Sequence, residues 1–301
     1  MLDSFSGLLL VITAGVCWIG AGISVSKSSA RGWDYNIIQG LSYLGSALLC
    51  ALILAGSMPE SGPEHFSGPA FQLSFLAGIT NFYTYVFTSK AMQRGPNGLV
   101  WGIMQAGMIG SFLMGVFFFG EKAAPVRLIG LVLILGGVLI MGMSKDNKTA
   151  EKGKNWMLPA LAAFLLVMLT HCCNALPSYL SAAETDSTVR TLGLYFGGFI
   201  GFALTTLPGM IRNRNFGGKG EWITAAILMI LNTSASLFFF FRGLNLLAQN
   251  GCGGLGYPVA TGVCVAGFSL YSLLILKEKI ARLSLIGLIA VCLGIITISL
   301  R

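Results

Sequence analysis

Apolar stretches of about twenty residues alternate along this chain with short polar segments, and a stretch of that length crosses the hydrocarbon core of a bilayer as one α-helix. The alternation therefore predicts an all-α integral membrane protein. The expected transmembrane helices are ten, over residues 5–24, 35–56, 69–90, 97–119, 126–143, 156–179, 188–209, 222–244, 252–275 and 281–299.

The composition also favours a membrane protein over a water-soluble one. Apolar residues make up 55% of the 301 residues and charged residues only 10%, whereas soluble domains carry roughly 25% charged residues. The net charge of +8 comes mainly from bases in the connecting segments, where they orient membrane helices. We expect a multi-pass protein of a bacterial inner or plasma membrane that contacts lipid and no nucleic acid.

The connecting segments on the two sides of the membrane differ in their content of lysine and arginine. The loops that follow the odd-numbered helices hold fourteen of the nineteen bases. The other side holds five, among them Arg190 and Arg242. Because basic loops tend to stay on the cytoplasmic side, we expect both termini outside.

One segment occurs twice: residues 120–137 and 277–294 share eight of eighteen positions at a constant offset of 157. Each copy is a charged turn followed by an apolar helix. Because each half holds five helices, an odd number, the second copy crosses the membrane in the opposite direction. The sequence predicts two inverted five-helix repeats, 1–143 and 156–301, joined by a linker at 144–155. Such halves can rock about a central site and open it alternately to each face.

Five plus five helices, together with the turns GEK at 120–122 and KEK at 277–279, resemble the drug/metabolite transporter superfamily and its ten-helix EamA-like members. The NALP segment at 174–177 and the glycine-rich fourth helix are similar to the sugar-porter branch, which contains the rhamnose and glucose/ribose porters. The resemblance implies a central cavity lined mainly by helices one to four and six to nine. It implies that the fifth and tenth helices are peripheral.

All eleven carboxylates lie in loops or at helix ends. The small multidrug exporters of this superfamily exchange protons for cationic drugs at a buried glutamate, and the absence of such a residue disfavours cation antiport here. Buried carboxylates are also common metal ligands and common general acids or bases. Because the predicted helices contain none, we expect no metal, no cofactor and no enzyme activity. Glu121 and Glu278 are interpreted as structural residues of the repeated turns.

Polar and aromatic side chains inside the predicted helices are few, and they are the candidates for a solute-binding site. Aromatic rings can stack on a solute, and amides can hydrogen-bond it. The alternatives are helix–helix hydrogen bonds for the amides and a membrane-interface belt for the aromatics. The candidates are the aromatics Trp18, Tyr85, Trp101 and Tyr257 and the amides Gln39, Asn81, Gln105, Asn174 and Asn232.

His171 and Arg242 are two further candidates, and each has two interpretations. The imidazole of His171 could relay a proton, since histidine titrates near physiological pH, or it could be a neutral packing residue. Arg242 lies close to the end of its predicted helix. It either faces the cavity as a cation suited to a carboxylate or phosphate, or extends to the membrane surface.

These patterns predict a secondary transporter that moves a small polar organic solute by alternating access. The scarcity of buried charge favours a sugar, an amino acid or a choline-like compound. An amino-acid or metabolite exporter of the same fold is one alternative, and a membrane scaffold or receptor that transports nothing is another. Proton coupling, with His171 as its candidate, stays open against facilitated diffusion or exchange, and a monomer stays open against a homodimer.

Overall fold

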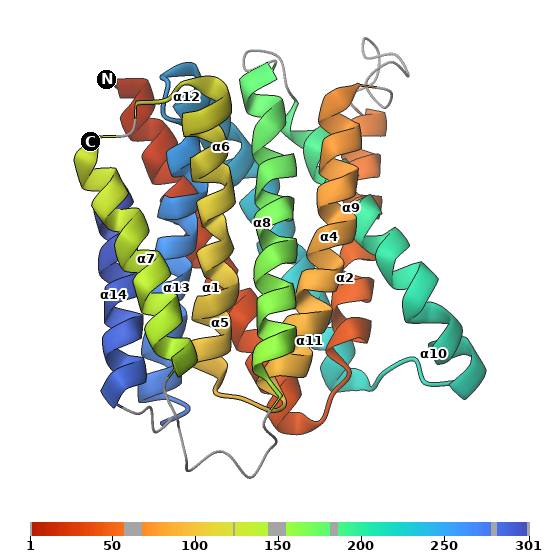
Figure 1. The fold of residues 1–301 in the computed structure, drawn as a ribbon. Coiled ribbons are helices and arrows are strands. Elements are labelled where there is room, and N and C mark those ends of the chain that lie inside the picture. Colours follow the sequence, from red (N-terminus) through yellow and green to blue (C-terminus); the bar gives the residue numbers. More distant parts are fainter. Residues whose placement is uncertain are drawn as a thin grey trace.

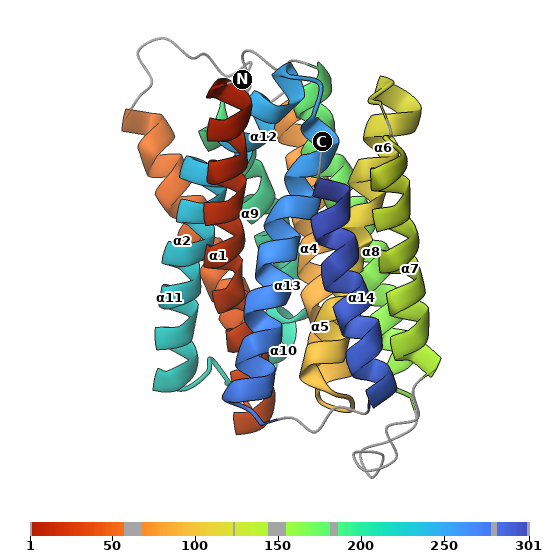
Figure 2. The same cartoon turned by 90° about the vertical axis from the view of Figure 1, so that its left-hand side faces the viewer.

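The computed structural model describes residues 2–56, 68–122, 124–143, 155–180, 186–277 and 282–299. Within these ranges every regular element is helical, and the helices stand side by side as an elongated bundle (Figures 1 and 2). The elements are α1 (Leu2–Arg31), α2 (Tyr35–Gly56), α4 (Pro69–Met92), α5 (Asn97–Gln105), η1 (Ala106–Met108), α6 (Ile109–Phe119), α7 (Pro125–Met143), α8 (Met157–Leu180), α9 (Ser187–Thr205), α10 (Leu207–Asn213), α11 (Lys219–Ser234), η3 (Ala235–Phe240), α12 (Phe241–Gln249), η4 (Gly253–Leu255), α13 (Gly256–Leu274) and α14 (Arg282–Ser299).

Each predicted membrane helix coincides with helical structure, which confirms the all-helical membrane fold. The predicted range 35–56 is α2, and the range 97–119 is the series α5, η1 and α6. Six of the described spans are long and apolar enough to cross a membrane, or seven if α9 and α10, bent by 46°, form one span. The number of ten transmembrane helices therefore stays a prediction.

Large apolar side chains cover the outside of the bundle. Leu52, Phe118 and Val132 expose 71%, 81% and 67% of their surfaces. Facing lipid, such exposure carries no penalty, whereas an unsatisfied polar group is costly there. Polar side chains accordingly turn inward, as Ser46 and Thr84 do with no exposed surface. This distribution of apolar side chains outside and polar side chains inside is typical of a helix bundle in lipid.

Two helices pack at the edge of the bundle, and the others pack around its centre. α7 and α14 pack chiefly on each other at one edge of the bundle (Figure 1), as their near lack of polar side chains predicted. α4 packs against α8 and α9, α1 against α13, and α2 against α9 and α11. α1 begins and α14 ends at the same end of the bundle (Figure 1).

Some predictions fall outside the described residues. These are most of the linker, residues 144–154, and the second repeated turn at Glu278 and Lys279. The division into two inverted halves and the orientation of the termini therefore stay predictions.

Two helices change their winding near the middle of the bundle. α5 continues through the 3₁₀ segment η1 into α6, and α11 continues through the π-helical segment η3 into α12. A π-turn adds a residue to the repeat and so rotates the helix face that follows it. Such segments occur frequently at functional sites.

Candidate functional site

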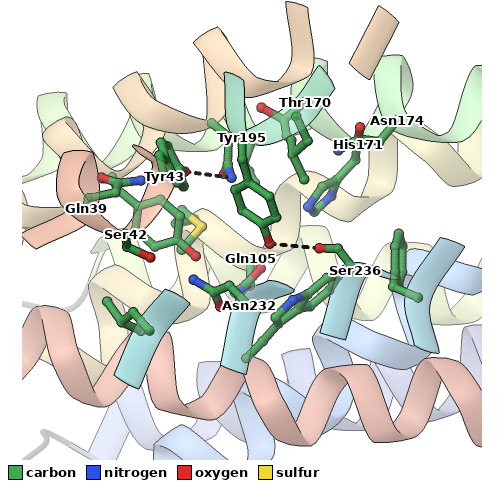
Figure 3. Close-up of a pocket in the computed structure, with 18 of the residues that line it drawn as sticks. Gln39, Ser42, Tyr43, Gln105, Thr170, His171, Asn174, Tyr195, Asn232 and Ser236 are labelled. Atoms are coloured by element: carbon green, nitrogen blue, oxygen red, sulfur yellow. Dashed lines mark hydrogen bonds between the residues drawn. The ribbon is translucent and has the colours of Figure 1, made fainter. Parts of the chain in front are cut away.

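A cavity of about 70 Å³ lies among the central helices (Figure 3). Its lining comes from α1, α2, α4, α5, α8, α9, α11, η3, α12 and α13. These elements belong to the first four and the sixth to ninth predicted helices, so the expected lining is confirmed. Ligand cavities usually measure about 300–1,000 Å³. The cavity is therefore smaller than most ligand sites, and we expect the surrounding helices to move apart when a solute binds.

Nine of the eleven candidate residues line this cavity. They come from seven different helices that are distant in sequence, and their amide, imidazole and aromatic groups meet in one place. They are Trp18, Gln39, Asn81, Tyr85, Gln105, His171, Asn174, Asn232 and Tyr257.

Trp101 and Arg242 do not line the cavity. Trp101 is 1% exposed and packs behind the lining, with its ring 6.2 Å from that of Tyr85 and 5.2 Å from that of Phe268. Arg242 is exposed on α12, so its interpretation as a cavity-facing cation is wrong. The π-helical turn explains the placement, because Phe240 and Phe241 take the inward positions and Arg242 follows them outward.

Other lining residues did not stand out in the sequence. Ser42 and Tyr43 lie three and four positions after Gln39, so the helical spacing of α2 was a usable signal. Tyr195 and Ser236 gave weaker signals, and the structure joins their hydroxyl oxygens at 2.9 Å (Figure 3). The remaining polar or aromatic lining residues are Tyr35, Thr170, Phe240 and Phe241.

The hydroxyl of Tyr43 is a hydrogen-bonding centre on one wall of the cavity. It accepts from Gln39 Nε2 at 2.7 Å and from Asn81 Nδ2 at 3.0 Å. A tyrosine hydroxyl can accept such bonds and also donates one. Since both observed bonds use Tyr43 as the acceptor, its own O–H remains available to a solute.

Four polar atoms of the lining are buried and lack a hydrogen-bond partner. They are Gln39 Oε1, Ser42 Oγ, His171 Nδ1 and Asn174 Oδ1. Buried polar groups are nearly always paired, and an unpaired one requires an explanation. All four belong to residues that line one cavity, and a polar solute that displaces these side chains would supply the missing partners.

Aromatic rings form the apolar part of the wall. The rings of His171 and Tyr257 stack with centroids 3.9 Å apart. Trp18 packs against Phe240 at 4.8 Å and stacks with Tyr257 at 6.3 Å. This combination of flat apolar faces and amide groups suits a small organic molecule with polar substituents.

The lining contains no carboxylate, and among the described residues no three His, Cys, Asp or Glu side chains gather as a metal site. The chemistry that this wall offers is hydrogen bonding and stacking. It can bind and orient a solute.

Glu121 ties together three elements at the end of the bundle where α1 begins. Its carboxylate accepts from the Tyr179 hydroxyl at 2.9 Å and from the backbone N–H of Gly254 at 3.1 Å. The Tyr179 ring stacks on Phe119 at 4.1 Å. We call this cluster of Phe119, Glu121, Tyr179 and Gly254 the turn clasp. It holds the first repeated turn to α8 and to the start of α13.

Comparison with known proteins agrees with the fold. Residues 5–143 match the EamA-like transporter family. A probable amino-acid metabolite efflux pump of Escherichia coli (strain K12) is 23% identical over 279 residues, which are 87% of this chain and 89% of that protein. A solved structure titled only "Crystal structure of protein" superposes with a TM-score of 0.65 over 98% of both chains at 14% identity, which shows a shared fold.

The apolar helices and the family match make the chain a multi-pass membrane protein. The resemblance to the drug/metabolite transporter superfamily is confirmed by the match of residues 5–143 to the EamA-like transporter family.

Proposed function

We propose that this chain is a secondary transporter that exports small polar metabolites of the amino-acid type by alternating access. The observation that carries the proposal is the central cavity, whose lining residues include four unpartnered polar atoms and several aromatic rings. Similarity to a probable amino-acid metabolite efflux pump favours export and this solute class. No finding favours the sugar-porter branch.

The small volume of the cavity supports alternating access over an open pore. A cavity of about 70 Å³ admits no organic solute without movement of the helices, and a continuous pathway would not need such movement.

Proton coupling, if present, would act through His171, whose Nδ1 is buried without a partner and whose side chain lines the cavity. An exchanger or facilitator needs no such relay.

Counterflow in proteoliposomes tests the proposal. Vesicles containing the purified protein are loaded with a pool of unlabelled L-amino acids and diluted into a trace of the same radiolabelled pool. Transient accumulation of label is expected, and parallel vesicles loaded with hexoses and pentoses are expected to show none. A scaffold or receptor would accumulate neither. Export in particular predicts that cells producing the protein retain less of the labelled pool than cells with an empty vector.

A matched pair of variants connects the flux to the cavity. Gln39→Ala removes a buried amide of the lining and is expected to reduce counterflow at least tenfold. Gln93→Ala removes an exposed amide at the end of α4 and is expected to change nothing. Equal flux through both variants would contradict transport through this cavity.

A further inference from the structure

Arg190 is a charged side chain buried inside the bundle, close to the cavity. It lies near the start of α9 and has no exposed surface. On sequence alone it was one of five bases assigned to the outer side of the membrane. The structure instead encloses its guanidinium between α8, α9 and α12.

The guanidinium contacts neutral groups. Nη1 donates to Ser178 Oγ and to Asn245 Oδ1, each at 2.8 Å. Nη2 donates to the backbone carbonyl of Asn174. The Phe241 ring lies under the guanidinium, with the Arg190 Cζ 4.2 Å from its centroid.

Among the described residues, no carboxylate pairs with Arg190. The nearest one in sequence, Asp186, caps α9 instead and accepts from the backbone N–H of Thr188 at 2.7 Å. Arg190 Nε is buried without a hydrogen-bond partner. The site therefore has a positive charge, an unused N–H donor and, within the part of the chain that the structure describes, no counter-ion.

An uncompensated buried charge is costly to a folded protein. Neutral side chains could join α8, α9 and α12 through the same hydrogen bonds at a lower cost. Ionisable residues inside membrane bundles usually mark a solute or ion site for this reason. The missing anion is then expected to come from outside the chain.

The position of Arg190 connects this charge to the cavity. Asn174 and Phe241, which contact the guanidinium, both line the cavity. A shift of Asn174 and Phe241 would bring an anion in the cavity closer to the guanidinium. The free amide oxygens of Gln39 and Asn174 are acceptors that suit an ammonium group on the same solute.

We propose that Arg190 binds the carboxylate of the transported solute, and that the solute is an amino acid or a similar amino-carboxylate. The inference rests on the proposed function and specifies the group that the cavity selects. One guanidinium neutralises the single charge of a carboxylate, whereas a phosphate ester carries about −1.5 to −2 at pH 7. Arginine also offers the forked pair of donors that a carboxylate accepts.

Thermal-shift titrations of the purified protein test the carboxylate directly. The probes are a pool of alanine, valine, leucine, methionine and phenylalanine, the pool of their amides, and the pool of amines left after removal of the carboxyl group. Phosphoethanolamine serves as the phosphate probe. Only the amino-acid pool is expected to raise the melting temperature of the wild-type chain, with apparent affinity at least tenfold above that of the amides.

Three variants then assign the effect to Arg190. Arg190→Gln is expected to lose the shift, Arg190→Lys to keep most of it, and Arg242→Gln, which removes an exposed arginine, to behave as wild type. The comparison among probes uses only the wild-type chain, so it decides the proposal even if Arg190→Gln fails to fold.

The outcomes separate this inference from the proposed function. Amides or amines that bind as well as the amino acids overturn the role of Arg190 and leave a transporter of polar metabolites. Undiminished binding of the amino-acid pool by Arg190→Gln does the same. A shift with phosphoethanolamine alone overturns the carboxylate assignment. No shift with any of these probes contradicts both the inference and the proposed function.

Discussion

Gly137 and Gly287 meet across the α7–α14 pair so closely that a Cβ on Gly137 would lie 2.6 Å from the carbonyl oxygen of Gly287. The reverse contact is present too, because a Cβ on Gly294 would lie 2.7 Å from the carbonyl oxygen of Gly130. The sequence repeat equates Gly130 with Gly287 and Gly137 with Gly294. The two copies of the repeated helix therefore pack through the same pair of contacts in both directions, as a local twofold relationship requires.

This contact predicts the effect of small substitutions. Gly137→Ala and Gly294→Ala are each expected to lower the free energy of unfolding by about 1–3 kcal/mol, because backbone atoms of the partner helix must retreat. The melting temperature of the purified protein is the measurement. Gly136→Ala is the control, since a Cβ there meets nothing within 4 Å. If Gly136→Ala destabilises the protein as much, close packing is not the cause.

The contact between α4 and α9 is tighter still and includes cavity-lining helices. A Cβ on Gly78 would lie 1.9 Å from the Leu194 carbonyl oxygen, and one on Gly197 would lie 2.0 Å from that of Phe75. Gly78→Ala and Gly197→Ala are expected to cost about 1–3 kcal/mol or more and to reduce counterflow together with stability. Gly209→Ala, which meets nothing within 4 Å, is expected to preserve both. Full activity in Gly78→Ala would contradict the close approach of the two helices.

Tyr43→Phe tests the hydrogen-bonding centre of the cavity. The change leaves the amide donors of Gln39 and Asn81 without the acceptor they now use. An unpaired buried donor costs about 1–3 kcal/mol, so a lower melting temperature and weaker solute binding are expected. Tyr83→Phe, on the same α4 as Asn81, is the control, since the structure gives its hydroxyl no hydrogen bond within the described ranges. A stable, fully active Tyr43→Phe would remove Tyr43 from the site.

The turn clasp predicts a change in access at one end of the bundle. Glu121→Ala removes the acceptor of the Tyr179 hydroxyl and of the Gly254 N–H, so this end is expected to open more often. Cys252, next to the clasp, reports the change as a several-fold faster reaction with a polar maleimide, in a chain whose other cysteines are replaced by serine or alanine. Lys122→Ala alters an exposed neighbour and is expected to leave the rate unchanged. An unchanged rate in Glu121→Ala would show that the clasp does not hold this end closed.

The helices were predictable because membrane helices depend on local properties of the chain. Long apolar stretches and the turns between them fixed the ends of α2 and of the α5–η1–α6 series. The bend between α9 and α10 and the π-helical turn η3 were not predicted, because no periodicity in the sequence marks a change of winding. That turn is why Phe241 faces the cavity and Arg242 faces outward.

The candidate site was predictable where residue type alone was informative. An amide such as Asn81 or Asn174 in a lipid-buried helix is costly unless it has a partner, so it faces the interior of the bundle. An arginine near a helix end is less informative, because the same residue can extend to the membrane surface or turn inward. The sequence favoured Arg242 as the candidate cation, and the structure buries Arg190 instead.

The sequence by itself determined that this is a helical membrane protein with a repeated segment. It also showed that polar and aromatic side chains occur within the membrane helices. These properties follow from hydropathy and length, which are local. Only the tertiary structure decided which of those side chains share a cavity, that Tyr43 joins Gln39 to Asn81, and that Arg190 lies behind Asn174 and Phe241. Those relationships depend on how each helix is rotated and packed against its neighbours, and contacts between residues distant in the chain set that rotation.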